Sequence, residues 1–228
     1  WDLATRQQVD AFGDYFARVY QLAFSPDGEL LATTDGAEDI TLWDVVSRRR
    51  VGRLDGAVEW VSSLTFSPDS VTLVAATGGG VKAWDVARRQ PISTFVSGLA
   101  NSVAFTPDGR ILVTADEDVV LWDVTSGQKL ATLDGHPERN TALAVSPDGA
   151  VLAAGDADYA IHLWDVEFVL QTARAVGRDV RLVAEAARLS GHTSDVMELT
   201  FIPDGGTLVS GSRDGAVRLW DVAEGREL

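Results

Sequence analysis

The sequence of 228 residues contains no cysteine and no long apolar run. The missing cysteine excludes disulfide bonds, thiolate metal sites and cysteine nucleophiles, and it is typical of a cytoplasmic protein. Because no window of about 18 apolar residues occurs, no segment is expected to span a membrane. Lysine is scarce, with only Lys82 and Lys129. Together with abundant Ala, Gly, Val and Asp, this bias is typical of a GC-rich bacterial genome.

Positive charge is also scarce. The chain has 34 acidic and 19 basic residues, which gives a net charge of −15. Such a surface repels phosphate backbones, so nucleic acid is not expected as a partner and a basic protein segment is favoured. The hydrophobic fraction of 46% is enough to bury a substantial core.

What the sequence does contain is a repeat of about 40 residues. A turn of the type Ser-Pro-Asp-Gly is followed 15 to 17 residues later by Leu-Trp-Asp or Ala-Trp-Asp. The aligned tryptophans are spaced by 42, 41, 38, 42 and 56 residues, and they are Trp1, Trp43, Trp84, Trp122, Trp164 and Trp220. A fixed period of this length indicates an architecture of stacked repeats.

Each unit reads as four short strands. A run such as "VSSLTFS" forms strand a, and the Pro-Asp-Gly turn leads into strand b ("TLVAAT"). Strand c ends at the Trp-Asp, and the more polar link to the next unit forms an outer strand d. The units span residues 3–44, 45–85, 86–123, 124–165 and 166–221, with residues 1–2 ending an earlier unit and 222–228 beginning another outer strand.

These five units resemble the WD40 repeat family, whose signatures are a Gly-His before strand a and the Trp-Asp that ends strand c. The resemblance implies an all-β fold, a single WD40-type β-propeller of four-stranded antiparallel blades over residues 1–228. WD40 propellers usually have seven blades, so the chain is interpreted as part of a larger propeller. Alternatively, residues 6–12 pair with strand c of the last unit and close a smaller ring.

The resemblance also implies a hydrogen-bonded network of Trp, a strand-b hydroxyl, an Asp in the b–c turn and the His of Gly-His. The last unit contains all four members: His192, Ser210, Asp214 and Trp220. The fourth unit keeps three of them, His136, Asp158 and Trp164, but has Ala154 in place of the hydroxyl. We expect these residues to be structural, because a buried indole N–H requires an acceptor.

The long spacing before Trp220 reflects an insertion of about 14 residues. Apolar residues at 169, 173, 176, 180, 183 and 187 predict a short amphipathic helix near 168–188, which Gly177 would weaken or interrupt. It either packs on its own blade or serves as a docking helix for another domain.

The sequence shows no constellation typical of an enzyme. His136 and His192 belong to the repeat, and His162 alternates with apolar neighbours, which predicts a position on the polar face of strand c. No Ser/His/Asp arrangement and no phosphate-binding glycine loop stands apart from the repeat. The acidic turns 35–39, 116–118 and 156–158 lack the alternating ligands of a Ca²⁺ loop. We therefore expect no catalytic residues, no metal and no cofactor.

A binding surface is better supported. The b–c turns and the loops before strand a share one face of a propeller, which we call the rim. From the loops before strand a it takes Arg18, Trp60, Leu99, Arg139 and Asp195, and from the b–c turns the acids Asp35, Glu38, Asp39, Asp116, Glu117, Asp118 and Asp156. Trp60 is a candidate hot spot for binding; alternatively, it packs under its own loop.

Two functions follow from these observations. The first is a non-enzymatic scaffold or recognition module that binds a basic partner segment on the acidic rim. The alternative is a regulatory or sensor WD40 domain of a larger bacterial signalling protein, with an ATPase or kinase effector elsewhere in the chain. These two hypotheses differ in the domains that are attached to this chain.

Overall fold

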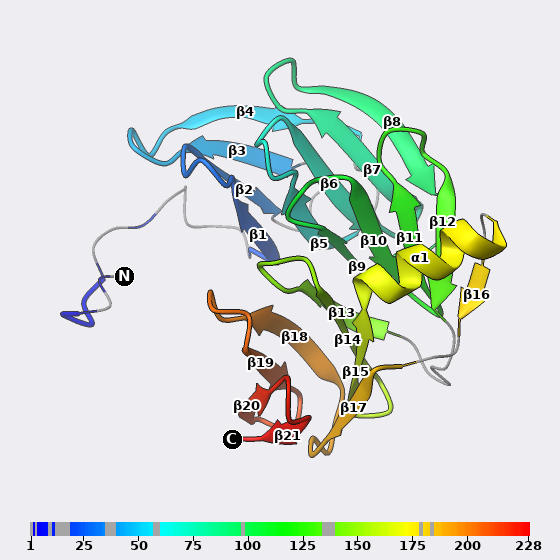
Figure 1. The fold of residues 1–228 in the computed structure, drawn as a ribbon. Helices are drawn as coiled ribbons and strands as arrows, with labels where there is room; N and C mark the ends of the chain where they lie inside the picture. Colours follow the sequence, from blue (N-terminus) through cyan, green and yellow to red (C-terminus); the bar gives the residue numbers. More distant parts are fainter. Residues whose placement is uncertain are drawn as a thin grey trace.

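The computed structural model describes residues 2, 4–8, 11, 19–34, 40–56, 60–96, 99–133, 140–177, 180–182 and 185–228, with the backbone alone at residues 93–96 and 140–141. The described chain forms five antiparallel sheets, which we call the first to fifth blades. They lie side by side around a common centre in an open arc, and Figure 1 shows an opening between the first and fifth blades. The predicted all-β fold of propeller blades is confirmed.

The blades follow one another along the chain, each with the same strand order. The first contains β1 (Gln21–Phe24), β2 (Leu30–Thr34), β3 (Ile40–Asp44) and β4 (Arg50–Leu54). The second contains β5 (Val61–Phe66), β6 (Thr72–Thr77), β7 (Gly80–Asp85) and β8 (Gln90–Val96). The third contains β9 (Ser102–Phe105), β10 (Ile111–Ala115), β11 (Val119–Asp123) and β12 (Lys129–Leu133).

The fourth blade reaches its outer strand through the insertion, and the outer strand of the fifth blade contains two residues. The fourth contains β13 (Asn140–Val145), β14 (Val151–Asp156), β15 (Ala160–Asp165) and β17 (Ala187–Ser190). The fifth contains β18 (Val196–Phe201), β19 (Thr207–Ser212), β20 (Val217–Asp221) and β21 (Arg226–Glu227). The outer neighbour of β20 is β21, and Gln7 bridges Asp2, so the alternative pairing of residues 6–12 with β20 is not seen in the described part of that segment.

The turn between strands a and b is held by its own side chains. In the third blade the Thr106 hydroxyl donates to Asp108 Oδ1 at 2.6 Å, and this bond holds the pKa of Asp108 below its usual value. Gly109 has a φ of 70°, the left-handed conformation that glycine adopts without strain. A β-carbon at Gly109 would lie 3.4 Å from Cδ of Pro68, so the turns of adjacent blades pack on one another. The Pro-Asp-Gly sequence thus serves both the turn and the contact between blades.

The core lies between the blades. Leu42 and Ile40 of the first blade pack against Leu64, Phe66 and Trp84 of the second, and similar apolar clusters join each later pair. Because four short strands cannot bury a face alone, each blade depends on its neighbours for its core.

The two outward faces of the arc show the same positions without a neighbour. Leu121 of the third blade is 1% exposed, whereas its equivalent Leu219 in the fifth blade is 46% exposed. On the first blade Phe24 is 56% exposed, whereas its equivalent Phe66 in the second blade is 5% exposed. Burial of these positions is therefore set by the adjacent blade and not by the residue type.

The insertion forms a helix and one further strand. The helix α1 (Val166–Val176) begins after Asp165, whose carboxylate accepts a hydrogen bond from the Phe168 N–H at 2.8 Å. It ends at Gly177, where φ is 103°. The strand β16 (Val180–Leu182) follows, so the predicted helix near 168–188 is confirmed only in its first half. Within the described ranges, no helix reaches the length and apolarity that a membrane crossing requires.

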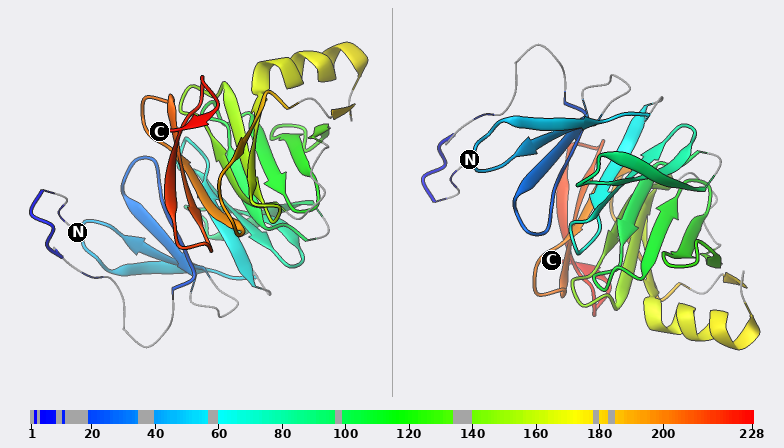
Figure 2. Two further views of the ribbon diagram at one scale, coloured as in Figure 1. Left: turned by 90° about the horizontal axis from the view of Figure 1, so that it is seen from below. Right: turned by 90° about the horizontal axis from the view of Figure 1, so that it is seen from above.

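The insertion packs on the preceding blade more than on its own. β16 pairs in parallel with β12 and becomes the fifth strand of the third blade. The buried face of α1, formed by Val166, Val169 and Ala173, joins an apolar cluster that contains residues of both the third and fourth blades. Figure 2 shows α1 at the outer edge of the arc. The expectation that the insertion packs on its own blade was therefore wrong in part, because β12 offers it a free sheet edge.

Candidate functional site

The fifth blade contains a chain of hydrogen bonds that begins at its tryptophan. The Trp220 indole N–H donates to Ser210 Oγ at 2.8 Å, and His192 Nε2 lies 2.7 Å from the same oxygen. On the other side of the imidazole ring, His192 Nδ1 lies 2.8 Å from Asp214 Oδ2. Backbone N–H groups of Thr193 and Ala216 also donate to Asp214, and these bonds, followed by the one with His192, depress the pKa of its carboxyl strongly. The network joins the loop before β18 to β19, β20 and their turn.

Three other tryptophans find different acceptors. The indole N–H of Trp43 donates to Thr33 Oγ1 at 2.8 Å, and that of Trp122 donates to Thr114 Oγ1 at 2.9 Å. Trp84 has no strand-b hydroxyl within reach and donates to the backbone carbonyl of Asp55 at 3.0 Å. The strand-b hydroxyl is therefore one solution among several to the same requirement for an acceptor.

The fourth blade replaces the network with another one. His162, expected on the polar face of its strand, is fully buried. Its Nε2 lies 2.9 Å from Asp156 Oδ2, and its Nδ1 lies 2.9 Å from Glu185 Oε1. Asp156, expected on the exposed rim, is also fully buried and accepts the N–H groups of Asp158 and Ala160.

The burial of His162 and that of Asp156 belong together, because the imidazole and the carboxylate lie 2.9 Å apart. His162 stands directly opposite Ala154 in the register of β14 and β15, and a residue this small leaves room for an imidazole on the same face of the sheet. The ring lies 6.1 Å from that of Trp164, almost parallel to it. Asp158, expected in the Trp network, instead pairs with the Arg188 guanidinium at 2.8 Å. His136 lies outside the described residues.

An aromatic pair stands at the rim. Trp60 is 57% exposed, and its ring packs edge-on against that of Tyr20, with 4.4 Å between the centroids. Leu99 is similarly exposed on the neighbouring loop. Trp60 is therefore not packed under its own loop.

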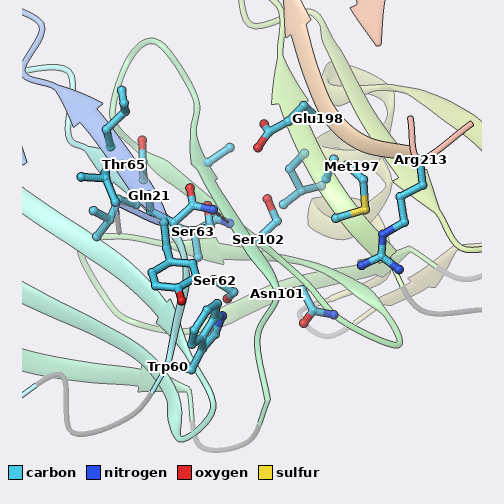
Figure 3. A pocket seen from close by; sticks show the side chains of 18 residues that line it. Gln21, Trp60, Ser62, Ser63, Thr65, Asn101, Ser102, Met197, Glu198 and Arg213 are labelled. Carbon is cyan, nitrogen blue, oxygen red and sulfur yellow. Dashed lines mark hydrogen bonds between the residues drawn. The ribbon is translucent and has the colours of Figure 1, made fainter. Parts of the chain in front are cut away.

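The aromatic pair opens into a cavity of about 980 Å³, which we call the channel. Its walls come from the innermost strands of all five blades: β1, β5, β9, β13 and β18. Small polar side chains, among them Ser62, Ser63, Thr65, Asn101 and Ser102, line it together with apolar ones such as Leu64, Val103 and Leu143 (Figure 3). Figure 3 shows Met197, Glu198 and Arg213 on the wall across from Trp60.

The acidic rim is less negative than the sequence predicts. Two of its described acids are paired with arginines, Asp118 with Arg181 at 2.8 Å and Asp195 with Arg213 at 2.9 Å. Asp158, in the b–c turn of the fourth blade, is likewise paired with Arg188 at 2.8 Å. Asp116 Oδ1 accepts a hydrogen bond from Asn101 Nδ2 at 2.8 Å, and Glu117 stands beside it in the same turn. The rim residues Arg18, Asp35, Glu38, Asp39 and Arg139 lie outside the described residues.

Sequence reasoning missed several residues of this site. Tyr20, Asn101 and Glu198 line the channel because each lies on, or next to, the start of a strand a. The signal that was available is the polar character of this position in successive units, as in Ser62-Ser63 and Asn101-Ser102. Arg181 and Arg188 gave no such signal, because they come from the insertion and from an outer strand, whereas Arg213 lies in the b–c turn of the fifth blade.

The acidic turns at 116–118 and 156–158, which the structure describes, do not converge on a metal site. Within the described ranges, no group of three or more His, Asp or Glu side chains is arranged to hold a metal ion. The turn at 116–118 directs Asp116 to Asn101 and Asp118 to Arg181, so its carboxylates serve separate partners. The turn at 35–39 lies outside the described residues.

Comparisons with known proteins agree with this architecture. The family pattern "WD domain, G-beta repeat" matches residues 7–44, 48–85, 89–123, 127–165 and 184–221. The chain is 29% identical over 234 residues to Periodic tryptophan protein 2 of Arabidopsis thaliana, which covers 99% of this chain and 24% of that protein. It is 32% identical over 150 residues to a guanine nucleotide-binding protein subunit beta of Oryza sativa subsp. indica, and the aligned part covers 60% of this chain and 36% of that protein.

A third relative is the protein groucho of Drosophila melanogaster, 31% identical over 161 residues that cover 66% of this chain and 20% of that protein. The chain thus spans about a quarter to a third of the length of the first curated relatives that it matches. These relatives are eukaryotic, so they lend no support to the bacterial origin expected from composition. The five matched repeats and the five blades show that the chain belongs to the WD40 repeat family.

Proposed function

We propose that this chain is a non-enzymatic protein–protein interaction module that binds a partner segment at the mouth of the channel. The observation that carries the proposal is the Tyr20–Trp60 pair, two aromatic rings in contact that remain largely exposed beside a polar cavity. Exposed aromatic residues next to a concave surface are typical binding hot spots. A relative named as a subunit of the guanine nucleotide-binding protein is by its name one chain of an assembly, which supports the same role.

The partner segment is basic in this proposal. The net charge of −15 attracts cations from a distance and repels acidic proteins. At the rim itself, a basic segment competes with Arg181, Arg188 and Arg213 for the acids that they now pair with. Those pairs are at least partly exposed and hence weak, so the exchange costs little.

The test is a selection of random displayed peptides on the immobilised chain, followed by affinity measurements at two salt concentrations. We expect the selected peptides to be basic and to lose affinity as salt increases. Trp60→Ala should lower the affinity of the selected peptides by roughly thirtyfold, the size expected when a hot-spot aromatic residue is removed.

Phe168→Ala is the matched control, because Phe168 is 52% exposed on α1 at the outer edge of the arc. It should leave the affinity unchanged. Peptides that bind equally well to the Trp60→Ala variant, or that show no charge preference, would contradict the proposal.

A further inference from the structure

Glu198 occupies a position that is neutral in every other blade. The strand-a residues that pair with strand b at the same register are Gln21, Ser63, Ser102, Ala142 and Glu198, one from each blade. Glu198 is therefore the one ionisable side chain in this ring of equivalent positions. The repeat does not require a carboxylate there, since four blades are built without one.

The carboxylate of Glu198 lacks a counter-charge of its own. Among the described residues, none donates a hydrogen bond to it or forms an ion pair with it. Arg213, the other charged residue that lines the channel, is already paired with Asp195 at 2.9 Å. Burial raises the pKa of Glu198 above its usual value, because partial removal from water disfavours the charged form. A carboxylate on the wall of a cavity that has no partner among the described residues is available to a cationic ligand.

The remaining walls suit one kind of cation. Hydroxyl and amide oxygens of Ser62, Ser63 and Asn101 offer acceptors, and the Tyr20 and Trp60 rings offer aromatic faces near the mouth. A guanidinium group has five donors in a plane and stacks on aromatic rings, whereas an ammonium group is a compact point charge. Paired with a carboxylate, a guanidinium forms two parallel hydrogen bonds.

We propose that the channel receives one arginine side chain of the partner, with its guanidinium group paired to the Glu198 carboxylate. This inference rests on the proposed function and specifies it further: the partner's anchor is an arginine inserted into the channel. Trp60 and Tyr20 then contact the segment that carries this arginine at the mouth.

The neighbouring residue provides a probe for this inference. Met197 is the only methionine in the chain, and it lines the channel next to Glu198. Protein labelled with ¹³C at the methionine methyl group therefore gives one resonance that reports from this wall. The ligand is the tripeptide acetyl-Gly-Arg-Gly-amide, with the citrulline and lysine tripeptides as neutral and ammonium counterparts.

We expect the arginine tripeptide to shift the Met197 resonance in a saturable manner. The citrulline tripeptide should not shift it, and the lysine tripeptide should bind several-fold more weakly than the arginine one. Glu198→Gln should weaken the arginine tripeptide about tenfold or more, since a charge-assisted pair is lost. Glu224→Gln, a change of the same kind in an exposed turn of the same blade, should have no effect.

Folding of the Glu198→Gln variant is checked by thermal unfolding. Removal of an uncompensated carboxylate should leave the midpoint at pH 7 unchanged or raise it, so a loss of binding is not a loss of structure. A Met197 resonance that responds equally to arginine and citrulline, or equally in the Glu198→Gln variant, would overturn the inference.

Failure of the proposed function has a different signature. Peptides selected on the whole chain that keep their dependence on Trp60 but ignore Glu198→Gln would reject the channel anchor alone. Conversely, an arginine-specific shift of Met197 without any Trp60-dependent binding of longer peptides would reject the proposed binding mode at the rim.

Discussion

The fourth and fifth blades each place a buried histidine about 6 Å from their tryptophan ring, but they take that histidine from different places in the chain. In the fifth blade His192 comes from the loop before the first strand and contacts the Ser210 hydroxyl of β19. In the fourth blade His162 comes from β15 itself, and its imidazole lies between two carboxylates. The histidine near the tryptophan is thus a loop residue in one blade and a strand residue in the other.

The difference between the two networks shows which segments of a blade such hydrogen bonds can connect. The fifth-blade network fastens a loop, β19 and a turn, all within one blade. The fourth-blade network connects β14 and β15 to Glu185, which lies between β16 and β17 at the end of the insertion. The histidine of the fourth blade therefore holds the insertion as well as the sheet.

The largest effect is expected from His162→Leu. The substitution removes the partner of Asp156, whose carboxylate has no access to water, while the backbone N–H groups remain. Because a hydrogen bond to a buried charged group is worth more than one between neutral groups, we expect a loss of about 3 kcal/mol of unfolding free energy. Urea denaturation measures the loss.

The double variant His162→Leu with Asp156→Asn is the control for this prediction. It should recover part of the loss, because the stranded charge is gone. If the single variant lost less than about 1 kcal/mol, the network would not stabilise the fourth blade as described.

An intermediate effect is expected from Ser210→Ala in the fifth blade. The change leaves the Trp220 N–H and His192 Nε2 without their shared partner, and a buried unsatisfied group costs about 1–3 kcal/mol. Hydrogen exchange should accelerate in β18, β19 and β20, with the fourth blade much less affected. Uniform acceleration over all blades would show that the two networks are not separate.

The smallest effect is expected from pH and concerns Asp214. Its pKa in the folded chain lies well below the ordinary value of 3.8, so the folded state favours the ionised form. The resulting stabilisation is fully present above about pH 4 and is lost as the pH falls toward the folded-state pKa. The difference in unfolding midpoint between wild type and Asp214→Asn should therefore be constant from pH 5 to 7 and shrink below pH 4. A difference that grew on acidification would have the opposite sign and would exclude this account.

The repeat and its networks explain which parts of the fold the sequence predicts. The Pro-Asp-Gly turn, the short apolar strands and the tryptophan recur five times at a nearly fixed spacing. A chance match repeated five times in the same register is improbable. The hydrogen bonds around Trp220 follow from offsets within one unit, and all four partners lie within 29 residues. Local, repeated features of this kind are readable without coordinates.

The features that were not predicted depend on contacts between distant residues. Asp118 pairs with Arg181 across 63 positions of the sequence, and Asp158 pairs with Arg188 across 30. Neither sequence separation is related to the period of the repeat, so the sequence predicts a more acidic rim than the structure shows. The burial of His162 likewise depends on the small residue opposite it, Ala154, which alternation along a single strand does not reveal.

The insertion illustrates a further limit. Its apolar spacing continues past Gly177 as though one helix persisted, but the backbone turns there and β16 pairs with β12. A free sheet edge nearby decided the outcome, and helical periodicity contains no information on such an edge. Short segments after a helix-ending glycine are therefore poorly predicted by their hydrophobic pattern alone.

The pairing of β16 with β12 has a consequence for how the chain unfolds. Repeat arrays usually behave as one-dimensional systems in which each unit opens with a cost set by its nearest neighbours. Here a segment that is covalently part of the fourth blade is also a strand of the third. Neither unit is able to open at this boundary without stripping a strand from the other, so the two act as one cooperative block. An array of five blades is then, in energetic terms, an array of four elements, one of them double in size.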